Sequence, residues 1–278
     1  MLKNVFTLTT ASVLSASVFA ADVRISGDQK WVYHDNDGAT ETELDGDFNV
    51  KASTETEPGL SIRADININE GGGNDGGSSL RIGGGFGKID MGDTSSAMDA
   101  IDDVTDWGEE RTEGVPSTDH AIRWTLPSIG GLNINASWAG DENQDGNSGG
   151  TSVSATYKIA GARLGYAMLD NDDDTEETLT NVRLKIAGVG LGYELHTATD
   201  AESVDTDTKA FGLTYSIGDA MLGYENVTVE SAGTTSEDIT AFGIHYDVAP
   251  ELTAFVEYST DDLDAGAETT SVGVEYSF

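Results

Sequence analysis

The sequence predicts an all-β fold: a transmembrane antiparallel β-barrel of about 16 strands, with a long loop folded into its lumen. Two observations carry the prediction, namely apolar and polar residues that alternate through many short segments, and gaps between segments that are in turn short and long. In the last segment, Val272, Val274, Tyr276 and Phe278 fall on one face and small or polar residues on the other. Period-two alternation is typical of a strand with one apolar and one wet face.

The same alternation recurs along the chain, mostly in segments of about 9–11 residues, the length that a tilted strand needs to cross a bilayer. The segments 78–84 and 87–92 are short, and 219–229 loses its alternation after Tyr224. We expect strands near 22–33, 44–55, 60–69, 78–84, 87–92, 119–126, 131–139, 151–159, 162–169, 179–186, 189–198, 207–217, 219–229, 237–248, 251–260 and 268–278.

The lengths of the gaps between these segments distinguish a membrane barrel from a pair of soluble sheets. One set is tight, as at Ala160-Gly161 and Ala187-Gly188, and carries three of the four prolines. The interleaved set is longer and mostly acidic, and comprises 34–43, 70–77, 93–118, 140–150, 170–178, 199–206, 231–236 and 261–267. Bacterial outer-membrane barrels have short turns at one end and long loops at the other, whereas soluble sheets have no reason to segregate loop length by end. Tyr and Trp near the segment ends suit interfacial aromatic girdles.

Composition narrows the function. The 278 residues carry a formal net charge of -36, so nucleic acid is excluded as a favourable partner by repulsion from its phosphates. Hydrophobic residues make up 37%, which is low for a single soluble core but suits a barrel with a wet interior. Because the chain has no cysteine, disulfides and thiolate chemistry are excluded.

Residues 1–20 have the features of a secretory signal peptide. Lys3 provides the positive start, a moderately apolar stretch follows, and Val18-Phe19-Ala20 offers small residues at the cleavage positions. We expect processing after Ala20, export across the inner membrane, and one barrel domain over 21–278.

The longest gap, 93–118, is the candidate functional segment. Ala97, Ala100, Ile101 and Val104 have helical spacing after Thr94-Ser95-Ser96, which predicts a capped helical turn or two. An apolar stripe needs a surface to pack against, and inside a barrel that surface is the inner wall; the alternative is an external acidic loop. The segment supplies the candidate acidic constriction residues Asp99, Asp102, Asp103, Asp106, Glu109, Glu110 and Glu113.

The basic residues occupy the polar positions of their segments, which face inward in a barrel. This is expected because a charge on the lipid face is energetically costly. The candidate basic residues of the pore wall are Arg24, Lys51, Arg63, Arg81 and Arg123. Lys158, Arg163, Arg183 and Lys185 follow the same rule later in the chain. An acidic loop facing a basic wall would filter solutes by size and charge, as charged rings do in channels.

Three stretches resemble the trimeric general-diffusion porins of Gram-negative bacteria. They are Ala21-Asp22-Val23, then Phe86-Gly87-Lys88-Ile89-Asp90-Met91-Gly92-Asp93 before the long loop, then 121–132 with its Ile122-Arg123-Trp124, and the chain ends at Phe278. The resemblance implies a 16-stranded homotrimer in the outer membrane, in contact with lipid and lipopolysaccharide, with the third loop in the pore. It also implies that the barrel assembly machinery recognises Phe278 and that small hydrophilic solutes and ions pass by diffusion. This chain departs from the family in its shortness and acidity, so the solute preference does not transfer.

Three other functions compete with a general channel. An outer-membrane enzyme would need a base next to a nucleophile, but His34, His120, His196 and His245 fall on separate segments. A calcium-binding repeat protein would need several copies of the glycine-rich stretch 71–77, which occurs once. The third alternative is a solute-specific channel or a purely structural, non-channel barrel. A solute-specific sugar channel would show aromatic residues inside the lumen, whereas most here have outward parity. We therefore expect a passive, cation-preferring porin without catalysis or a cofactor; structural Ca²⁺ at the acidic loops remains a hypothesis.

Overall fold

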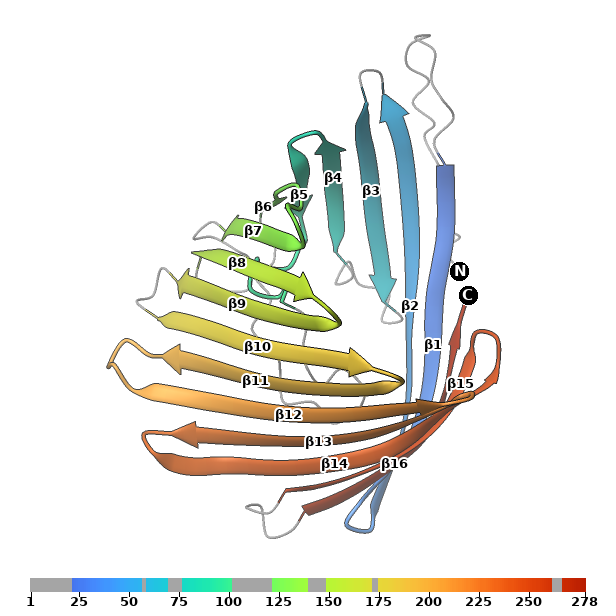
Figure 1. The fold of residues 1–278 in the computed structure, drawn as a ribbon. Helices are drawn as coiled ribbons and strands as arrows, with labels where there is room; N and C mark the ends of the chain where they lie inside the picture. The colour runs from blue at the N-terminus through green and yellow to red at the C-terminus, as the bar shows by residue number, and fades with distance from the viewer. Residues whose placement is uncertain are drawn as a thin grey trace, which may run out of the picture.

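Sixteen antiparallel strands close into one barrel (Figure 1). The computed structural model describes residues 22–56, 59–69, 77–101, 122–139, 149–171, 175–261 and 267–278. The strands are β1 (Asp22–Asn36), β2 (Ala39–Thr56), β3 (Leu60–Asn69), β4 (Ser78–Gly84), β5 (Gly87–Gly92), β6 (Ile122–Thr125), β7 (Leu132–Ala139), β8 (Gly150–Ile159), β9 (Ala162–Asn171), β10 (Glu176–Ile186), β11 (Val189–Thr199), β12 (Asp205–Ile217), β13 (Ala220–Ser231), β14 (Thr234–Ala249), β15 (Leu252–Asp261) and β16 (Ala267–Ser277). The predicted antiparallel barrel of about 16 strands is confirmed, whereas the predicted lumen loop is described only as far as Ile101. No helix in the described ranges is long and apolar enough to span a membrane.

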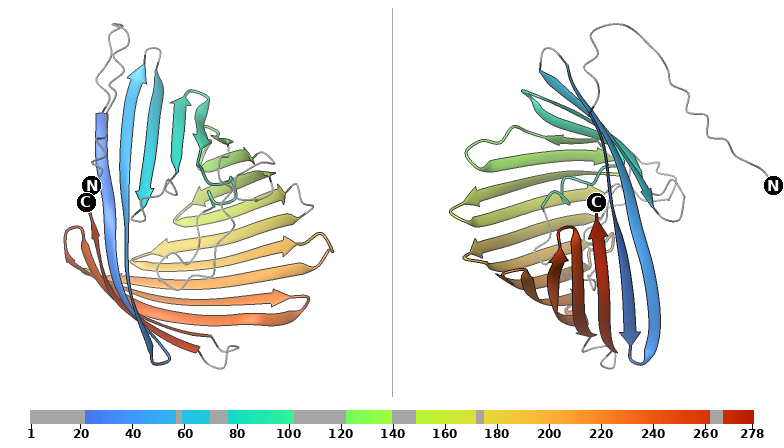
Figure 2. Two further views of the ribbon diagram at one scale, coloured as in Figure 1. Left: turned by 180° about the vertical axis from the view of Figure 1, so that it is seen from behind. Right: turned by 90° about the vertical axis from the view of Figure 1, so that its right-hand side faces the viewer.

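The barrel closes between its first and last strands. β1 pairs with β16 from Asp28 opposite Ser277 to Asn36 opposite Thr269, and with β2 on its other side. The backbone of Phe278 extends the seam, since its N–H donates to the Gly27 carbonyl (2.9 Å) and its carbonyl accepts from the Gly27 N–H (3.0 Å). In Figure 2 the red β16 lies against the blue β1. Closure leaves no edge strand, so every strand has a hydrogen-bonded neighbour on each side.

The two faces of the sheet differ as the alternation predicts. Leu191, Leu213 and Tyr224 lie directly opposite one another on neighbouring strands, and all three are exposed on the outside. Thr214, next in sequence to Leu213, has the opposite parity and faces the lumen. Exposed apolar side chains in such numbers would be unfavourable in water, but they match the hydrocarbon core of a bilayer.

Two of the expected long loops are instead tight hairpins. The predicted gap 34–43 is filled by extensions of β1 and β2, which are joined at Asp37-Gly38, and 231–236 contains only the turn Ala232-Gly233. Both turn residues have positive φ in each case (49° and 85°, 49° and 75°), the arrangement of a type I′ turn that suits the twist of a hairpin. These extensions could not be predicted from alternation. Beyond the apolar band both faces of a strand contact water, so the residues no longer alternate although the strands remain paired.

β13 also continues where its alternation fails. Beyond Tyr224 the outward positions become polar, and Asn226 donates through Nδ2 to Asp238 Oδ1 (3.1 Å) and Thr240 Oγ1 (3.1 Å) on β14. Cross-strand hydrogen bonds replace lipid contacts at this height, so the strand continues without an apolar face, with one register shift against β14 between Val229 and Glu230.

The largest apolar core among the described residues lies inside the lumen. Met98 and Ile101, in the segment after β5, pack with Ala167, Leu169 and Leu179 of β9 and β10, and all five are at most 3% exposed. We call these five residues the inner cluster. Figure 2 shows the teal segment that follows β5 inside the ring of strands. The start of the long loop is therefore attached to the inner wall, on the opposite side of the sheet from lipid.

We predict that Met98→Ala with Ile101→Ala releases this segment. Truncating a fully buried Met or Ile costs about 2–5 kcal/mol, so local opening should become more frequent. In the folded, detergent-solubilised protein, trypsin should cleave after Arg111 at least about tenfold faster. Met168→Ala is the matched control, because Met168 lies on β9 between two cluster residues but points outward and is 53% exposed. Equal cleavage rates in both variants would contradict the role given to the cluster.

Candidate functional site

The segment 93–101 begins with a reciprocal cap. The Ser96 backbone N–H donates to Asp99 Oδ2 (2.8 Å), and the Asp99 N–H donates back to Ser96 Oγ (3.2 Å). The Ile101 N–H then donates to the Met98 carbonyl (2.9 Å). This is the geometry of a capping box, here followed by a turn over residues 97–100 rather than by an assigned helix. The expected helical turn is thus present as a capped turn as far as Ile101.

Four wall residues hold this segment by hydrogen bonds. The Ala97 N–H donates to both Ser137 Oγ and Ser152 Oγ, each at 2.8 Å. Arg123 Nη1 donates to Ser95 Oγ (2.6 Å), and Arg163 Nη2 donates to the Ala100 carbonyl (3.2 Å). Because these donors and acceptors lie on β6, β7, β8 and β9, the segment crosses the inner face of four neighbouring strands.

Of the seven candidate acidic constriction residues, the structure describes one. Asp99 takes part in the cap just described. Asp102, Asp103, Asp106, Glu109, Glu110 and Glu113 lie outside the described residues, as do the signal peptide and its cleavage position. Their place in a constriction stays a prediction.

The candidate basic residues all face inward, and three of them form part of one cross-strand row. Arg63 lies opposite Arg81, Arg81 opposite Asp90, and Asp90 opposite Arg123. The buried Asp90 carboxylate contacts Arg81 Nε and lies 3.6 Å from Arg123 Nη2, while Arg63 pairs with Asp65 at 2.8 Å. Several positive charges on this wall are therefore partly offset by neighbouring carboxylates.

Arg24 and Lys51 stand apart from that row. They lie opposite each other on β1 and β2, and the largely exposed Arg24 side chain is 3.5 Å from Asp22. An exposed pair of this kind contributes little to stability. On its other side, Lys51 lies opposite Asp65 of β3.

The opposite arc of the wall is acidic. Glu225, Glu257 and Glu275 have inward parity on β13, β15 and β16, and the first two are at most 5% exposed. Asp28 on β1 lies opposite Asp47 on β2 and continues this arc. The lumen thus has a basic side, mainly on β3 to β10, and an acidic side, mainly on β11 to β2.

The described histidines fit structural roles better than catalysis. His196 Nε2 lies 2.9 Å from Glu177, and His245 Nε2 lies 2.6 Å from Glu257. His120 lies outside the described residues.

His34 resembles part of a catalytic triad, since Nδ1 is 2.9 Å from Ser271 Oγ and Nε2 is 3.6 Å from Glu43. A nucleophile must reach its substrate, yet Ser271 is 1% exposed. β16 pairs with a strand on each side, so its backbone N–H groups are engaged and supply no oxyanion hole.

The described residues contain no group of three or more His, Cys, Asp or Glu side chains placed to hold a metal ion. The acidic stretches 172–174 and 262–266 lie outside the described residues, so the calcium hypothesis remains a prediction for them.

Phe278 closes the barrel and presents its ring outward. The ring is 50% exposed and stacks on Tyr276, with centroids 6.0 Å apart. Its role as an assembly signal stays a prediction.

Sequence reasoning missed the wall residues that hold the loop. Ser137 and Ser152 are indistinguishable from other lumen serines, so no signal marks them. β9 carries a usable signal, because Gly165, Ala167 and Leu169 make its inward face as apolar as its outward face. An apolar inward face in a wet lumen indicates that another segment covers it.

Comparison with known proteins agrees with this architecture. The family model described as Gram-negative porin matches residues 8–266. No curated protein sequence matches the chain at a significant level.

Solved structures are similar in fold, and each is covered over its full length. The chain is similar to a porin refined at 1.8 Å resolution, with TM-score 0.75, 17% identity and 92% of this chain covered. It is also similar to a loop-deletion mutant of OmpT, an outer membrane protein of Vibrio cholerae (TM-score 0.73, 15% identity, 93% covered). A triple mutant of the Rhodopseudomonas blastica porin gives TM-score 0.72 at 14% identity, with 92% covered.

At these identities the solved structures establish the fold, and the family match extends over nearly the whole chain. A closed 16-stranded barrel with a wet, charged lumen and an apolar outer band is the architecture that this family places in the outer membrane as a channel. The chain belongs to the Gram-negative porins.

Proposed function

We propose that this porin is a passive, water-filled channel for small hydrophilic solutes and ions, with a preference for cations. The observation that carries the proposal is the lumen wall, where charged side chains of both signs occupy inward positions on opposite arcs. A polar, two-sided field of this kind orients hydrated solutes without binding them tightly. The proposed channel requires no catalytic group and no bound cofactor.

An aromatic track for one class of solute finds no support in the described strands. Among their Phe, Tyr and Trp residues, only Phe255 has inward parity, and it is 3% exposed. Its ring stacks on His245 and covers Gly273, so it fills a place in the wall instead of lining the passage. This favours a general channel over a solute-specific one.

The cation preference rests on net charge. The chain carries 50 Asp and Glu against 14 Lys and Arg, and nearly all basic residues of the described strands face the lumen already. The excess of negative charge lies on the acidic arc and in the loops, including the candidate acidic residues of 93–118. Negative potential at the mouths raises the local concentration of cations.

Reversal potential across a salt gradient in a planar bilayer tests this preference. With a tenfold KCl gradient, we expect the sign that corresponds to K⁺ entering more readily than Cl⁻. The preference should weaken at about 1 M salt, where the screening length falls to about 3 Å. A reversal potential of the opposite sign would overturn the proposed cation preference.

A second pair of variants tests the place of the acidic loop. Asp102→Asn with Asp103→Asn should shift the reversal potential more than Asp172→Asn with Asp173→Asn, although both pairs remove two charges. Charges at the narrowest part of a channel act on every ion, whereas charges on an outer loop are screened. Equal shifts would show that 93–118 is not the constriction.

We further propose that the porin is a homotrimer that contacts outer-membrane lipid and lipopolysaccharide. Support comes from membership of the porin family and from the continuous outer apolar band. Chemical crosslinking of the detergent-extracted protein should stop at three subunits. A product that stops at one or two subunits would rule the trimer out.

A further inference from the structure

The hairpin of β1 and β2 extends beyond the strand on its other side. β2 is 18 residues long, but its pairing with β3 begins only at Asp47, which lies opposite Asn69. The first part of β2, residues 39–46, pairs with β1 alone among the described strands. Figure 1 shows β2 continuing past the end of β3 toward the hairpin turn. We call residues 39–46 the free edge.

Every second residue of the free edge directs its backbone groups away from β1. In a hairpin with a two-residue turn, the two flanking residues bond to each other, so the next residue points to the other side. After the turn at Asp37-Gly38, the residues that point away are Thr40, Thr42, Leu44 and Gly46. The Gly46 N–H donates to Asp45 Oδ1 (2.8 Å) instead of to a strand. Within the described part of the chain, no strand pairs with the other three on this side.

The free edge is accessible to another polypeptide. Residues 39–45 are exposed, and they follow a turn at the end of the barrel where the longer gaps lie. An unpaired strand edge is a template on which an extended chain can add a further strand. In an antiparallel addition, Thr40, Thr42 and Leu44 can each exchange two backbone hydrogen bonds with the added strand. The free edge therefore has the geometry of a docking site for an extended segment.

One face of the free edge is apolar where it meets the outer band. Leu44 lies opposite Trp31 of β1, and both side chains are exposed on the outside (51% and 42%). An added strand would place every second side chain on this face. Apolar or small side chains fit there, because they would continue the apolar surface of Leu44 and Trp31.

The opposite face is acidic. His34 Nε2 lies 3.6 Å from Glu43, and Lys30 lies opposite Asp45, so part of the charge is offset from the β1 side. An excess remains, because residues 34–47 contain no Lys or Arg but six carboxylates, which are Asp35, Asp37, Glu41, Glu43, Asp45 and Asp47. Lys or Arg side chains of an added strand would form cross-strand ion pairs on this face.

Charge also disfavours a second copy of the chain as the occupant. Two free edges paired with each other would bring Glu41, Glu43 and Asp45 of both copies together, and like charges opposite one another destabilise a sheet. Natural edge strands often carry charges that prevent such self-pairing. The open ladder and the acidic face together favour a partner of opposite charge.

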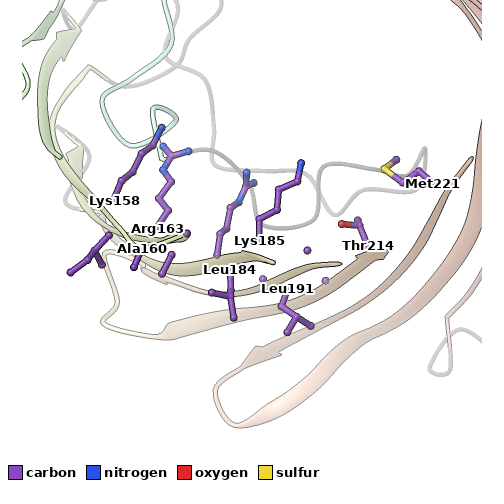
Figure 3. A pocket seen from close by; sticks show the side chains of 15 residues that line it. Lys158, Ala160, Arg163, Leu184, Lys185, Leu191, Thr214 and Met221 are labelled. Carbon is purple, nitrogen blue, oxygen red and sulfur yellow. The ribbon is translucent and has the colours of Figure 1, made fainter. Parts of the chain in front are cut away.

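The far end of the lumen carries basic side chains of its own. A cavity of about 680 Å³ lies there, beside the tight turn at Ala160-Gly161. Figure 3 shows the labelled Lys158, Arg163 and Lys185 side chains rising from the same face of the sheet at this cavity. A basic polypeptide is therefore expected at the hairpin, at the opposite end of the barrel.

We propose that the free edge binds an extended segment of a basic polypeptide in which Lys or Arg alternate with apolar or small residues. The segment adds a strand to β2 beyond the apolar band. Its backbone supplies the hydrogen bonds, and the two faces of β2 select its side chains. This interaction does not depend on passage of solutes through the channel.

Fluorescence anisotropy tests the proposal on the detergent-solubilised full-length protein. The probe is a labelled, end-capped octapeptide of alternating lysine and valine, and we expect saturable binding at about 0.05 M salt. With lysines on the acidic face, the valine N–H groups face β2. N-methylation of the valines should therefore weaken binding about tenfold or more, whereas N-methylation of the lysines should change it less than about threefold. Equal effects, or no binding of the unmethylated peptide, would overturn the docking site.

Two variants at one position test the edge itself. Thr42→Pro removes an N–H from the free edge and should weaken binding about tenfold or more, while Thr42→Ala retains the N–H and should bind within about twofold of the unmodified protein. Proline is tolerated on an edge where its nitrogen faces solvent, so both variants should keep the heat-dependent shift of a folded barrel on a detergent gel. Equal affinity in the two variants would contradict the proposal.

Charge variants identify the chemistry of the partner. Glu41→Gln with Glu43→Gln should weaken binding of the lysine peptide more than Asp172→Asn with Asp173→Asn, although each pair removes two charges. An octapeptide of alternating glutamate and valine that bound as tightly as the lysine peptide would overturn the choice of a basic partner. Loss of crosslinked subunits in Thr42→Pro would show that the free edge pairs with a second copy, which would also overturn that choice.

Discussion

The pairing of β1 with β16 is the constraint on which the rest of the structure depends. Hydrocarbon offers no hydrogen-bond partner, so a sheet is stable there only when it has no open edge. Once the sheet closes, alternation of side chains divides every strand between lipid and lumen. The apolar outer band, the inward parity of the strand lysines and arginines other than Lys209, and the interior cavities all follow from closure.

Closure also explains why the main apolar core of the described residues lies in an unusual place. A barrel buries no side chains between layers, so its strands have no core of their own. The inner cluster forms because a segment of chain enters the lumen and packs on β9 and β10. Apolar packing has no preferred direction, but hydrogen bonds fix the orientation of the segment: Ser137 and Ser152 accept from its backbone, and Arg123 and Arg163 donate to it. The segment is thus held by both its side chains and its backbone.

The lumen combines charges of both signs without neutralising them everywhere. Where carboxylates alternate with arginines, as around Asp90, the charges offset one another. On β8, β9 and β10 the cations Lys158, Arg163 and Arg183 share one cross-strand row.

Most of the barrel could be predicted from the order of residues, because apolar and polar residues alternate along a strand that has lipid on one face and water on the other. This alternation predicted all sixteen strands and the inward parity of Arg63, Arg81 and Arg123. The segment after β5 differed from the other gaps because it is the longest. Alternation failed where both faces are wet, as in the extensions of β1 and β2 around Asp37-Gly38, because hydrogen bonding continues there without an apolar signal.

Contacts between distant segments could not be predicted in the same way. The placement of Met98 against Leu179, the donation from Ala97 to Ser152 and the gathering of Lys158, Arg163 and Arg183 depend on cross-strand register. Parity states which face a side chain occupies but not its height on the barrel wall. Register is fixed by closure of the whole sheet, and so these neighbours exist only in the folded barrel.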